Sequence, residues 1–404
     1  MNISFEDTRT AFHYKTTTEL KRARFLFKMM EKRWLVKVGL WFIPFAIRTG
    51  LPVKWLIRRT LFSQFVGGET LEDTAKMVAR LSKFNVYTIL DYGAEGKESE
   101  ESFDKTATEF IKVITYAASQ ADIPFISVKV TALARFGLLQ KIGSISEYAD
   151  NINGVISLAA LNNYEKAEWE RVVARLYKIA ESAAANNIGL LIDAEESWIQ
   201  NAIDATAIQM MKQFNRHKAV VYNTAQLYRK DRLQFIKDCN EHALENNFIC
   251  AMKLVRGAYM EKERKRATEL NYSSPINETK QDTDNEYNTA LEFCINPINN
   301  LYTVIGSHNE YSNLYSTELM EKFGLSFNDP RIHFSQLFGM SDHITFNLAK
   351  AGCSVSKYLP FGQVKDVIPY LLRRAQENSS VGEQSGRELS LIRKELKRRR
   401  LFGN

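Results

Sequence analysis

Two kinds of hydrophobic pattern divide the chain near residue 84. Before it, segments such as TTTELKRARFLFKMMEKRW place Thr or Ser ahead of Glu and apolar residues, which is typical of helix starts. After it, short apolar runs rich in β-branched residues alternate with longer helical stretches such as YEKAEWERVVARLYKIAESAAAN. The pattern predicts an N-terminal helical arm followed by βα units around a parallel sheet.

Eight segments of the second part have the composition of strands. They are 85–93, 125–132, 188–196, 218–224, 248–255, 301–308, 331–337 and 355–360. Their centres are almost wholly apolar, as expected for strands buried on both faces. Eight strands with helices between them favour an α/β fold of the (β/α)8 barrel type over a doubly wound sheet. No GxGxxG follows any of these strands, so a Rossmann dinucleotide site is not expected.

Composition and charge refine this division of the chain. The 404 residues are 45% hydrophobic, which is ample for one large core. We expect a helical region at 1–83, a catalytic barrel at 84–385 and a basic tail at 386–404. The formal net charge of +7 comes in part from RKELKRRR at 393–400. Such a run predicts a solvated, frayed tail, and contact with anionic lipid or nucleic acid is the alternative.

Cysteine, histidine and the N-terminus exclude several classes of protein. The four cysteines form no CxxC pair and the six histidines no HExxH, so we expect a reducing compartment and no metal. The first residues resemble neither a signal nor a transit peptide. The apolar run VGLWFIPFAI at 38–47 has basic flanks and is too short to span a bilayer. It predicts either an amphipathic cap on the barrel, which we favour, or a surface that rests on a membrane.

Polar residues collect where several predicted strands end. They are Asp193, Glu195 and Glu196; Asn223 and Thr224; Arg256; Ser307, His308 and Asn309; and Gln336. In a (β/α)8 barrel the carboxyl ends of the strands carry the active site. One polar strand end means little, but five together indicate a site.

Three short segments carry candidate chemistry. MKLVRGAY at 252–259 offers two cations and a Gly-Ala step that lets the backbone approach an anionic or electron-rich cofactor. In YLLRRAQEN at 370–378, Glu377 can orient Arg373 or Arg374, which is suited to bidentate binding of a carboxylate. A solvated helix face with salt bridges is the alternative for that segment. Lys129 stands in an apolar strand, where it can pair with a ligand carboxylate, pair with Asp193, or form a Schiff base as in barrel aldolases.

Longer strings from the same regions resemble the proline dehydrogenase family. KLVRGAYMEKERKRATELNYSSPIN (253–277), IGSHNE (305–310) and HFSQLFGMSDHITFNLAKAGCSVSKYLPFGQVKDVIPYLLRRAQENSSV (333–381) carry the resemblance. The earlier pieces ILDYGAEG, VKVTAL, LLIDAEE and YNTAQLY fall in the same order. The match covers roughly 85–381 and is closer to the single-function, mitochondrial-type members than to bifunctional bacterial proteins.

The resemblance implies roles for individual residues. Asp193 and Lys253 are implied as catalytic, ordering the site and standing near the hydride-accepting nitrogen of the flavin. The implied substrate-binding residues are Lys129, Leu337, Tyr358, Arg373, Arg374, Tyr259 and Glu377. The implied cofactor-binding residues are Ala194, Gln226, Lys253, Arg256, Gly257, Ala258, Ser307 and His308. The bifunctional proteins have Arg at Lys253, Lys at Arg256 and Trp at Met260, so adenine contacts inferred from that Trp do not carry over.

The implied activity is oxidation of L-proline to 1-pyrroline-5-carboxylate, with hydride transfer to FAD and electrons passed to a membrane quinone. A separate pyrroline-5-carboxylate dehydrogenase is then expected as pathway partner, and nucleic acid is not. We expect the cytoplasm with peripheral contact to the inner membrane in a bacterium, or the matrix side of the mitochondrion in a eukaryote. Two rivals remain open: a Schiff-base lyase or aldolase using Lys129, and a nucleic-acid- or lipid-binding protein led by the basic run.

Overall fold

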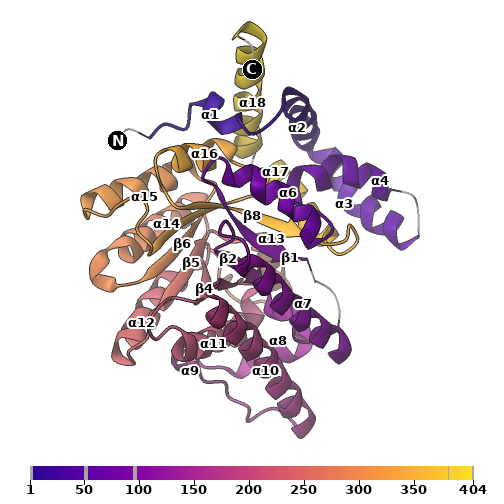
Figure 1. Ribbon diagram of the computed structural model, residues 1–404. Coiled ribbons are helices and arrows are strands. Elements are labelled where there is room, and N and C mark those ends of the chain that lie inside the picture. Colours follow the sequence, from indigo (N-terminus) through magenta and orange to yellow (C-terminus); the bar gives the residue numbers. More distant parts are fainter. Residues whose placement is uncertain (1–2, 50–52, 94–97, 381, 403–404) are drawn as a thin grey trace. The chain divides into compact units, whose positions relative to one another are not determined.

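Eight strands close into a barrel in the order in which they occur in the sequence. The computed structural model describes residues 3–49, 53–93, 98–380 and 382–402. The strands are β1 Tyr87–Tyr92, β2 Phe125–Val128, β3 Gly189–Ile192, β4 Val221–Gln226, β5 Ala251–Val255, β6 Tyr302–Gly306, β7 Ile332–Leu337 and β8 Val355–Phe361. Helices alternate with them, so the predicted (β/α)8 class is confirmed (Figure 1).

Burial explains why these segments are strands. Every residue of β2, β3, β4 and β8 is buried. Side chains on both faces of a barrel strand meet apolar neighbours, the interior on one face and the helices on the other. The registers are parallel, with Ile89 opposite Tyr358 between β1 and β8 and Thr224 opposite Lys253 between β4 and β5.

Contacts divide the chain into two compact units. Unit 1 is Met1–Glu95 with Ser335–Asn404, and unit 2 is Gly96–Phe334. The helices of unit 2 are α7 Glu100–Ala118, α8 Phe136–Ile145, α9 Tyr148–Asn153, α10 Asn163–Asn186, α11 Ser197–Phe214, α12 Arg232–Glu245, α13 Met260–Glu269, α14 Lys280–Ile295 and α15 Glu310–Lys322. Capping boxes begin α7, α10 and α14, where Ser99, Asn162 and Thr279 satisfy backbone donors of the first turn.

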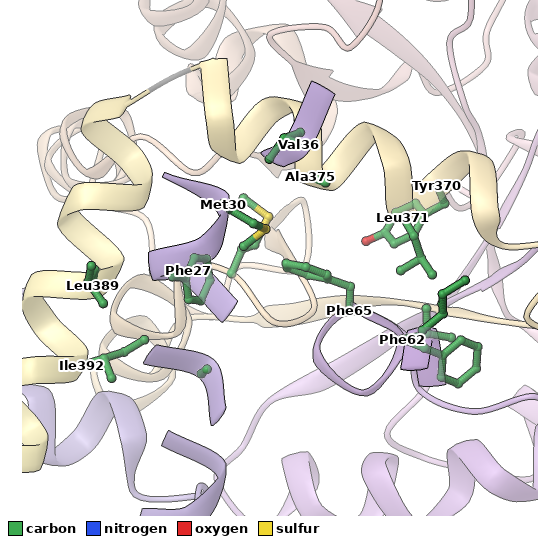
Figure 2. Close-up of a cluster of buried hydrophobic side chains, with 14 of the residues drawn as sticks. Phe27, Met30, Val36, Phe62, Phe65, Tyr370, Leu371, Ala375, Leu389 and Ile392 are labelled. Carbon is green, nitrogen blue, oxygen red and sulfur yellow. The ribbon is translucent and has the colours of Figure 1, made fainter. Parts of the chain in front are cut away.

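Unit 1 confirms the predicted N-terminal helices. They are α1 Thr8–Phe12, α2 Thr17–Met30, α3 Arg33–Arg48, α4 Lys54–Ile57, a π-helical turn Arg58–Phe62, α5 Ser63–Phe65 and α6 Leu71–Ser82. Figure 2 shows side chains of these helices, among them Phe27, Met30 and Phe65, in one buried cluster with Leu371 and Ile392 from the C-terminal part. The arm therefore shares a hydrophobic core with α17 Ile368–Ser380 and α18 Gly382–Phe402, and α16 Asp342–Lys350 lies against α1.

The basic run near the C-terminus is not the frayed tail that its charge predicted. It belongs to α18, which lies against α1 and α2 (Figure 1). Leu389 and Ile392 enter the core cluster, and Arg398 and Arg399 both bind the buried Glu395. The prediction was wrong because the charges alternate with apolar positions at helical spacing, so one face of the segment is buried.

Helix α3 is apolar on two sides. Leu40, Ile43 and Ile47 contact the core cluster. Trp41, by contrast, keeps 71% of its surface exposed and stacks on Phe45, which is 48% exposed. The predicted amphipathic helix therefore has one packed apolar face, and its aromatic rings lie exposed on another. No helix among the described residues is long and apolar enough to cross a bilayer.

Candidate active site

An ion pair joins the carboxyl ends of two strands in unit 2. Lys253 lies on β5, and its Nζ is 2.7 Å from Oδ1 of Asp193, which directly follows β3. Both side chains keep only about a tenth of their surface, 8% and 13%. The predicted pairing of Lys129 with Asp193 stays a prediction, and Lys253 is one partner of this carboxylate.

Glu195 is the second buried carboxylate at this edge. Its Oε1 and Oε2 accept hydrogen bonds from the backbone N (3.1 Å) and the Oγ1 (2.6 Å) of Thr131. Loss of hydration raises the pKa of Glu195 to about 7, although Thr131 and the nearby charge of Lys129 lower it. Lys129 lies directly after β2 rather than inside it, because the strand ends at Val128 and a 3₁₀ turn Val130–Ala132 follows.

A chain of buried hydrogen bonds links the backbone of Glu195 to residues of α11 and α12. The backbone N of Glu195 donates to Oε1 of Gln200, and Nε2 of Gln200 donates to Asp204. Asp204 also accepts from Asn223 and forms a 2.6 Å ion pair with Arg232. Sequence reasoning missed Gln200, Asp204 and Arg232, because residues on helices carry no local signal for pairing with a strand end.

The predicted end of β4 also needs correction. Asn223 and Thr224 were predicted at the strand end, but β4 continues to Gln226 and both residues are buried inside it. Asn223 binds Asp204, and Thr224 donates its hydroxyl to the carbonyl oxygen of Ile192. They stabilise the barrel wall, and Gln226 takes the place at the end of the strand.

Gln226 connects the ends of β3 and β5. Its Nε2 donates to the carbonyl oxygen of Glu195 at 2.7 Å, and its Oε1 accepts a long 3.4 Å bond from the backbone N of Ala258. Gly257 beside it has a φ of +130°, and a Cβ there would lie 2.6 Å from the ring of Tyr228. Glycine is therefore required, and the Gly257–Ala258 backbone remains exposed above the buried Lys253.

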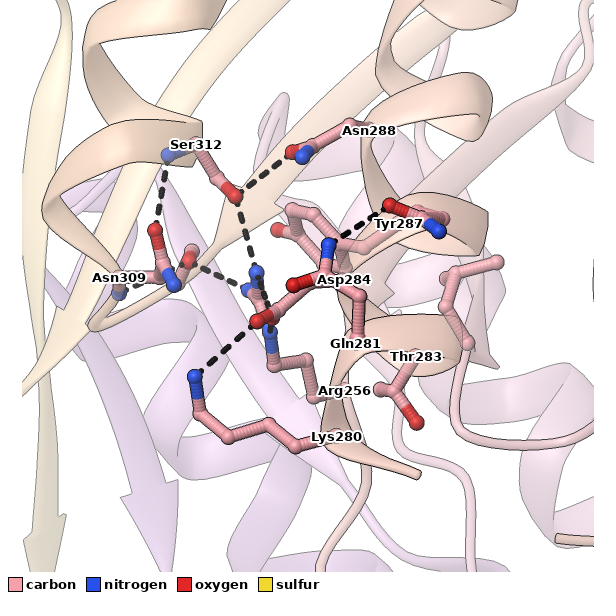
Figure 3. Close-up of polar contacts among 12 residues, drawn as sticks. Arg256, Lys280, Gln281, Thr283, Asp284, Tyr287, Asn288, Asn309 and Ser312 are labelled. Carbon is pink, nitrogen blue, oxygen red and sulfur yellow. Dashed lines mark hydrogen bonds and ion pairs between the residues drawn. The ribbon is translucent and has the colours of Figure 1, made fainter. Parts of the chain in front are cut away.

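The guanidinium of Arg256 is bound by protein groups (Figure 3). It contacts Asp284 at 2.7 Å, the Oγ of Ser307 at 3.0 Å and the Oγ of Ser312 at 2.9 Å. Its centre lies 4.3 Å from the ring centroid of Tyr287. Burial raises the pKa of Asp284, but the attraction of Arg256 outweighs it and the net shift is downward. Arg256 thus binds Ser307, which follows β6, and the sequence did not predict this hydrogen bond.

The remaining predicted residues of unit 2 lie at the same strand ends. Ala194 is half-buried between Asp193 and Glu195, and His308 is half-buried directly after Ser307. Tyr259 is buried at the start of α13, with Nζ of Lys262 5.5 Å from its ring centroid. Apart from Asn223 and Thr224, the structure therefore gathers the predicted residues of this unit near one edge of the barrel.

Unit 1 contains two of the three residues predicted for the substrate carboxylate, Arg373 and Arg374, whereas Lys129 belongs to unit 2. Arg374 on α17 is buried, pairs with Glu377 and lies 5.1 Å from the ring centroid of Tyr370. Loss of hydration raises the pKa of Glu377 against the effect of Arg374 and Arg373, although 35% of its side chain stays exposed. The Nε of Arg374 and the hydroxyl of Tyr370 are buried without a hydrogen-bond partner among the described residues.

Two apolar contacts predicted for the substrate also lie in unit 1. Tyr358 is buried on β8, and its carbonyl oxygen accepts from the backbone N of Phe338 at 2.9 Å. Leu337 is half-buried at the end of β7. The predicted residues therefore form two groups. Asp193, Glu195, Gln226 and Lys253 belong to unit 2, and Leu337, Tyr358, Arg373 and Arg374 belong to unit 1.

Together the fold and these groups define an enzyme of the (β/α)8-barrel class with charged residues at the carboxyl ends of its strands. The family model of proline dehydrogenase matches residues 74–387. The chain therefore belongs to the proline dehydrogenase family, a family of oxidoreductases whose reaction is the first step of proline catabolism.

Curated relatives agree with this assignment. The chain is 32% identical to "Proline dehydrogenase 1, mitochondrial" of Dictyostelium discoideum, over 97% of this chain and 74% of the relative. It is 31% identical to "Hydroxyproline dehydrogenase" of Xenopus laevis (98% and 90%). It is 33% identical to "Carbapenem antibiotics biosynthesis protein CarD" of Pectobacterium carotovorum subsp. carotovorum (84% and 85%).

Solved structures share the fold. Proline utilization A from Bdellovibrio bacteriovorus, inactivated by N-propargylglycine, matches with a TM-score of 0.69 and 18% identity. The match covers 96% of this chain and 38% of that chain. This chain therefore spans less than half the length of that protein, and the likeness concerns the fold.

Proposed function

We propose that this protein oxidises L-proline to 1-pyrroline-5-carboxylate and transfers the hydride to a bound FAD. The observation that carries the proposal is that the Nε of Arg374 and the hydroxyl of Tyr370 are buried without a hydrogen-bond partner in the described part of the chain. A buried donor without an acceptor costs about 1–3 kcal/mol, so a site that retains two of them is suited to an anionic ligand. Burial raises the pKa of Tyr370, so its hydroxyl remains a donor at neutral pH.

The strand ends of unit 2 fit the cofactor. Lys253 offers an ammonium donor, Gln226 a donor and an acceptor, and Gly257–Ala258 an exposed backbone. This donor set suits the carbonyl and nitrogen edge of a flavin. Ala194, Ser307 and His308 complete the proposed cofactor-binding residues, and Arg256 contributes by holding Ser307. When bound, the flavin supplies the hydride-accepting centre, and the protein supplies orientation and charge.

The chain's own residues are assigned the following tasks with proline. Arg373, Arg374 and Lys129 bind its carboxylate, and Glu377 orients Arg374. Tyr358, Leu337 and Tyr259 contact the ring. Asp193 keeps Lys253 in place through the 2.7 Å ion pair. The amine must be neutral for hydride to leave the adjacent ring carbon, and solvent accepts the proton.

The visible spectrum tests this proposal. Purified protein should absorb as a flavoprotein, and anaerobic L-proline should bleach the absorbance. A colourless protein that FAD does not reconstitute would contradict the proposal. Trapping of Lys129 with a carbonyl substrate by borohydride would instead support the Schiff-base alternative.

The electron acceptor is proposed to be a membrane quinone, reached by peripheral contact. The exposed side chains Trp34, Trp41, Phe42, Phe45, Trp55 and Leu56 on α3 and α4, called here the aromatic surface, support this contact. Large exposed apolar groups among Arg and Lys are typical of segments that lie in a membrane interface. The protein would then work on the inner membrane of a bacterium, or on the matrix side of a mitochondrion. A separate pyrroline-5-carboxylate dehydrogenase would consume the product.

Sedimentation with anionic vesicles tests the membrane contact. The protein should sediment at low salt and be released at high salt, because each basic residue contributes about 1 kcal/mol near an anionic surface. Changing Trp41, Phe42 and Phe45 to Ser should abolish sedimentation. Tyr164 and Tyr311 are similarly exposed in unit 2, and changing both to Ser is the matched control. A wild-type protein that stays in the supernatant at low salt would refute the contact.

A further inference from the structure

The carboxylate of Glu195 accepts two hydrogen bonds from the turn that follows Lys129. Both of its oxygens bind the same residue, Thr131, one at the backbone N and one at the hydroxyl. Two bonds to one residue leave the carboxylate little freedom to rotate. Since Thr131 lies two residues after Lys129 in a short 3₁₀ turn, the position of Lys129 depends on these two bonds.

Glu195 is itself held on both sides of its backbone. Its N–H donates to Gln200 at 2.9 Å, and its carbonyl oxygen accepts from Gln226 at 2.7 Å. Gln200 binds Asp204, which is wholly buried. Glu195 keeps only 4% of its surface exposed. Glu195 therefore links this buried hydrogen-bond network to the turn that follows Lys129.

Charge reinforces the geometry. Lys129 attracts the carboxylate of Glu195, while Glu196 repels it and is itself paired with Lys262 at 2.8 Å. Burial of a carboxylate is costly, and strongly perturbed carboxylates cluster at functional sites. Proline oxidation as described above assigns no role to Glu195.

We propose that Glu195 is a positioning residue that holds the Lys129 ammonium where it binds the carboxylate of the substrate. The proposal rests on the proposed function, in which Lys129 contacts that carboxylate. It follows that the effect of Glu195 on ligand binding must depend on the presence of Lys129.

A double-mutant cycle tests this dependence. The ligand is tetrahydrofuran-2-carboxylate, the ring-oxygen analogue of proline, and its Kd for the holoenzyme is measured by calorimetry. Glu195→Gln keeps an acceptor for Thr131 but removes the charge. It should raise the Kd roughly tenfold, as expected for loss of a charged hydrogen-bond acceptor. In the Lys129→Met background the same change should alter the Kd by less than about twofold. The KM for proline should follow the Kd, with kcat little changed.

Glu263 provides a matched control. It is fully buried and accepts two 2.6 Å bonds from the backbone N and the hydroxyl of Ser197, as Glu195 does from Thr131. Glu263→Gln should cost stability without a Lys129-dependent change in Kd. If Glu195→Gln does not fold, Thr131→Val removes one of the two bonds and should raise the Kd about threefold, again only when Lys129 is present.

The outcomes separate the two ideas. An equal effect of Glu195→Gln with and without Lys129, or no effect, overturns the positioning role while leaving the proposed function intact. If Lys129→Met alone leaves the Kd unchanged, the carboxylate role of Lys129 fails, and the positioning role fails with it.

Discussion

Helices α17 and α18 each bury an arginine, and the two arginines are used differently. The side chains of Arg374 on α17 and Arg399 on α18 are both 7% exposed, and each pairs with a glutamate of its own helix. Arg399 also donates to the carbonyl oxygens of Lys15 and Phe12. Arg374 leaves its Nε without a partner among the described residues.

Two buried carboxylates differ in the charges around them. Asp342 is bound by Lys357 at 2.9 Å, Lys15 at 2.8 Å and the hydroxyl of Tyr14 at 2.9 Å. Burial raises the pKa of Asp342, but Lys15 and Lys357 outweigh it and the net shift is strongly downward. Glu195 has its pKa raised to about 7, because burial outweighs its partners. Two cations thus favour the ionised form of Asp342, whereas burial opposes the charge of Glu195.

The largest effect is expected where the ion-pair cluster around Asp342 is broken. Asp342→Asn leaves Lys357, which is wholly buried, without its counter-ion. Unfolding in urea should show a loss of about 3–5 kcal/mol. Adding Lys357→Met should recover part of that loss. A loss below about 1 kcal/mol would show that the cluster is not structural. Since the pKa of Asp342 is lowered from its ordinary value, its contribution should be lost in wild type as the pH falls below about 4.

Removing the guanidinium of Arg374 should instead affect substrate binding. Arg374→Met should raise the KM for proline by a factor equivalent to about 2–5 kcal/mol, with FAD still bound. Arg373→Met should behave similarly. Arg399→Met is the matched control, because it should reduce stability and leave the KM unchanged. Wild-type kinetics in both Arg373→Met and Arg374→Met would mean that this pair is only a helix-face salt bridge.

The pH dependence of stability should distinguish Glu195 from Asp342. Its folded pKa of about 7 exceeds the ordinary 4.5, so the folded state binds the proton more tightly. Stability should therefore fall as the pH rises from about 4.5 to 7, by up to about 3 kcal/mol from this group. Glu195→Gln should gain stability relative to wild type between pH 5 and pH 8, measured by urea unfolding. A constant difference between the two proteins would show that Glu195 remains ionised throughout.

The smallest effect concerns an uncharged neighbour of the site. The bulk of Tyr358 should exclude the hydroxyl of 4-hydroxyproline, so the wild type should clearly prefer proline. In Tyr358→Ser the ratio of kcat/KM for proline to kcat/KM for 4-hydroxyproline should fall roughly tenfold, which is the usual effect of a small change in pocket size. Tyr358→Phe keeps the ring and should keep the preference. Equal activity of the wild type on both substrates would contradict this role.

Much of the fold could be predicted because periodicity is local. All eight predicted strands occur, and the N-terminal helices occur, since apolar runs and helix caps report burial within a few residues. Strand ends were less certain. Lys129 and Asn223 fell on the wrong side of their boundaries, because an apolar run does not show where pairing stops.

The sequence by itself determined the barrel, the family and the residue types available at the strand ends. Only the tertiary structure decided how those charges are used. It paired Asp193 with Lys253, bound Arg256 to Ser307 and Asp284, and turned the basic run into a packed helix. Such pairings join residues that are far apart in the chain, and the ion pair between Lys15 and Asp342 is another example. Hydrophobic spacing repeats along the chain, whereas an ion pair is settled only when the fold brings its two members together.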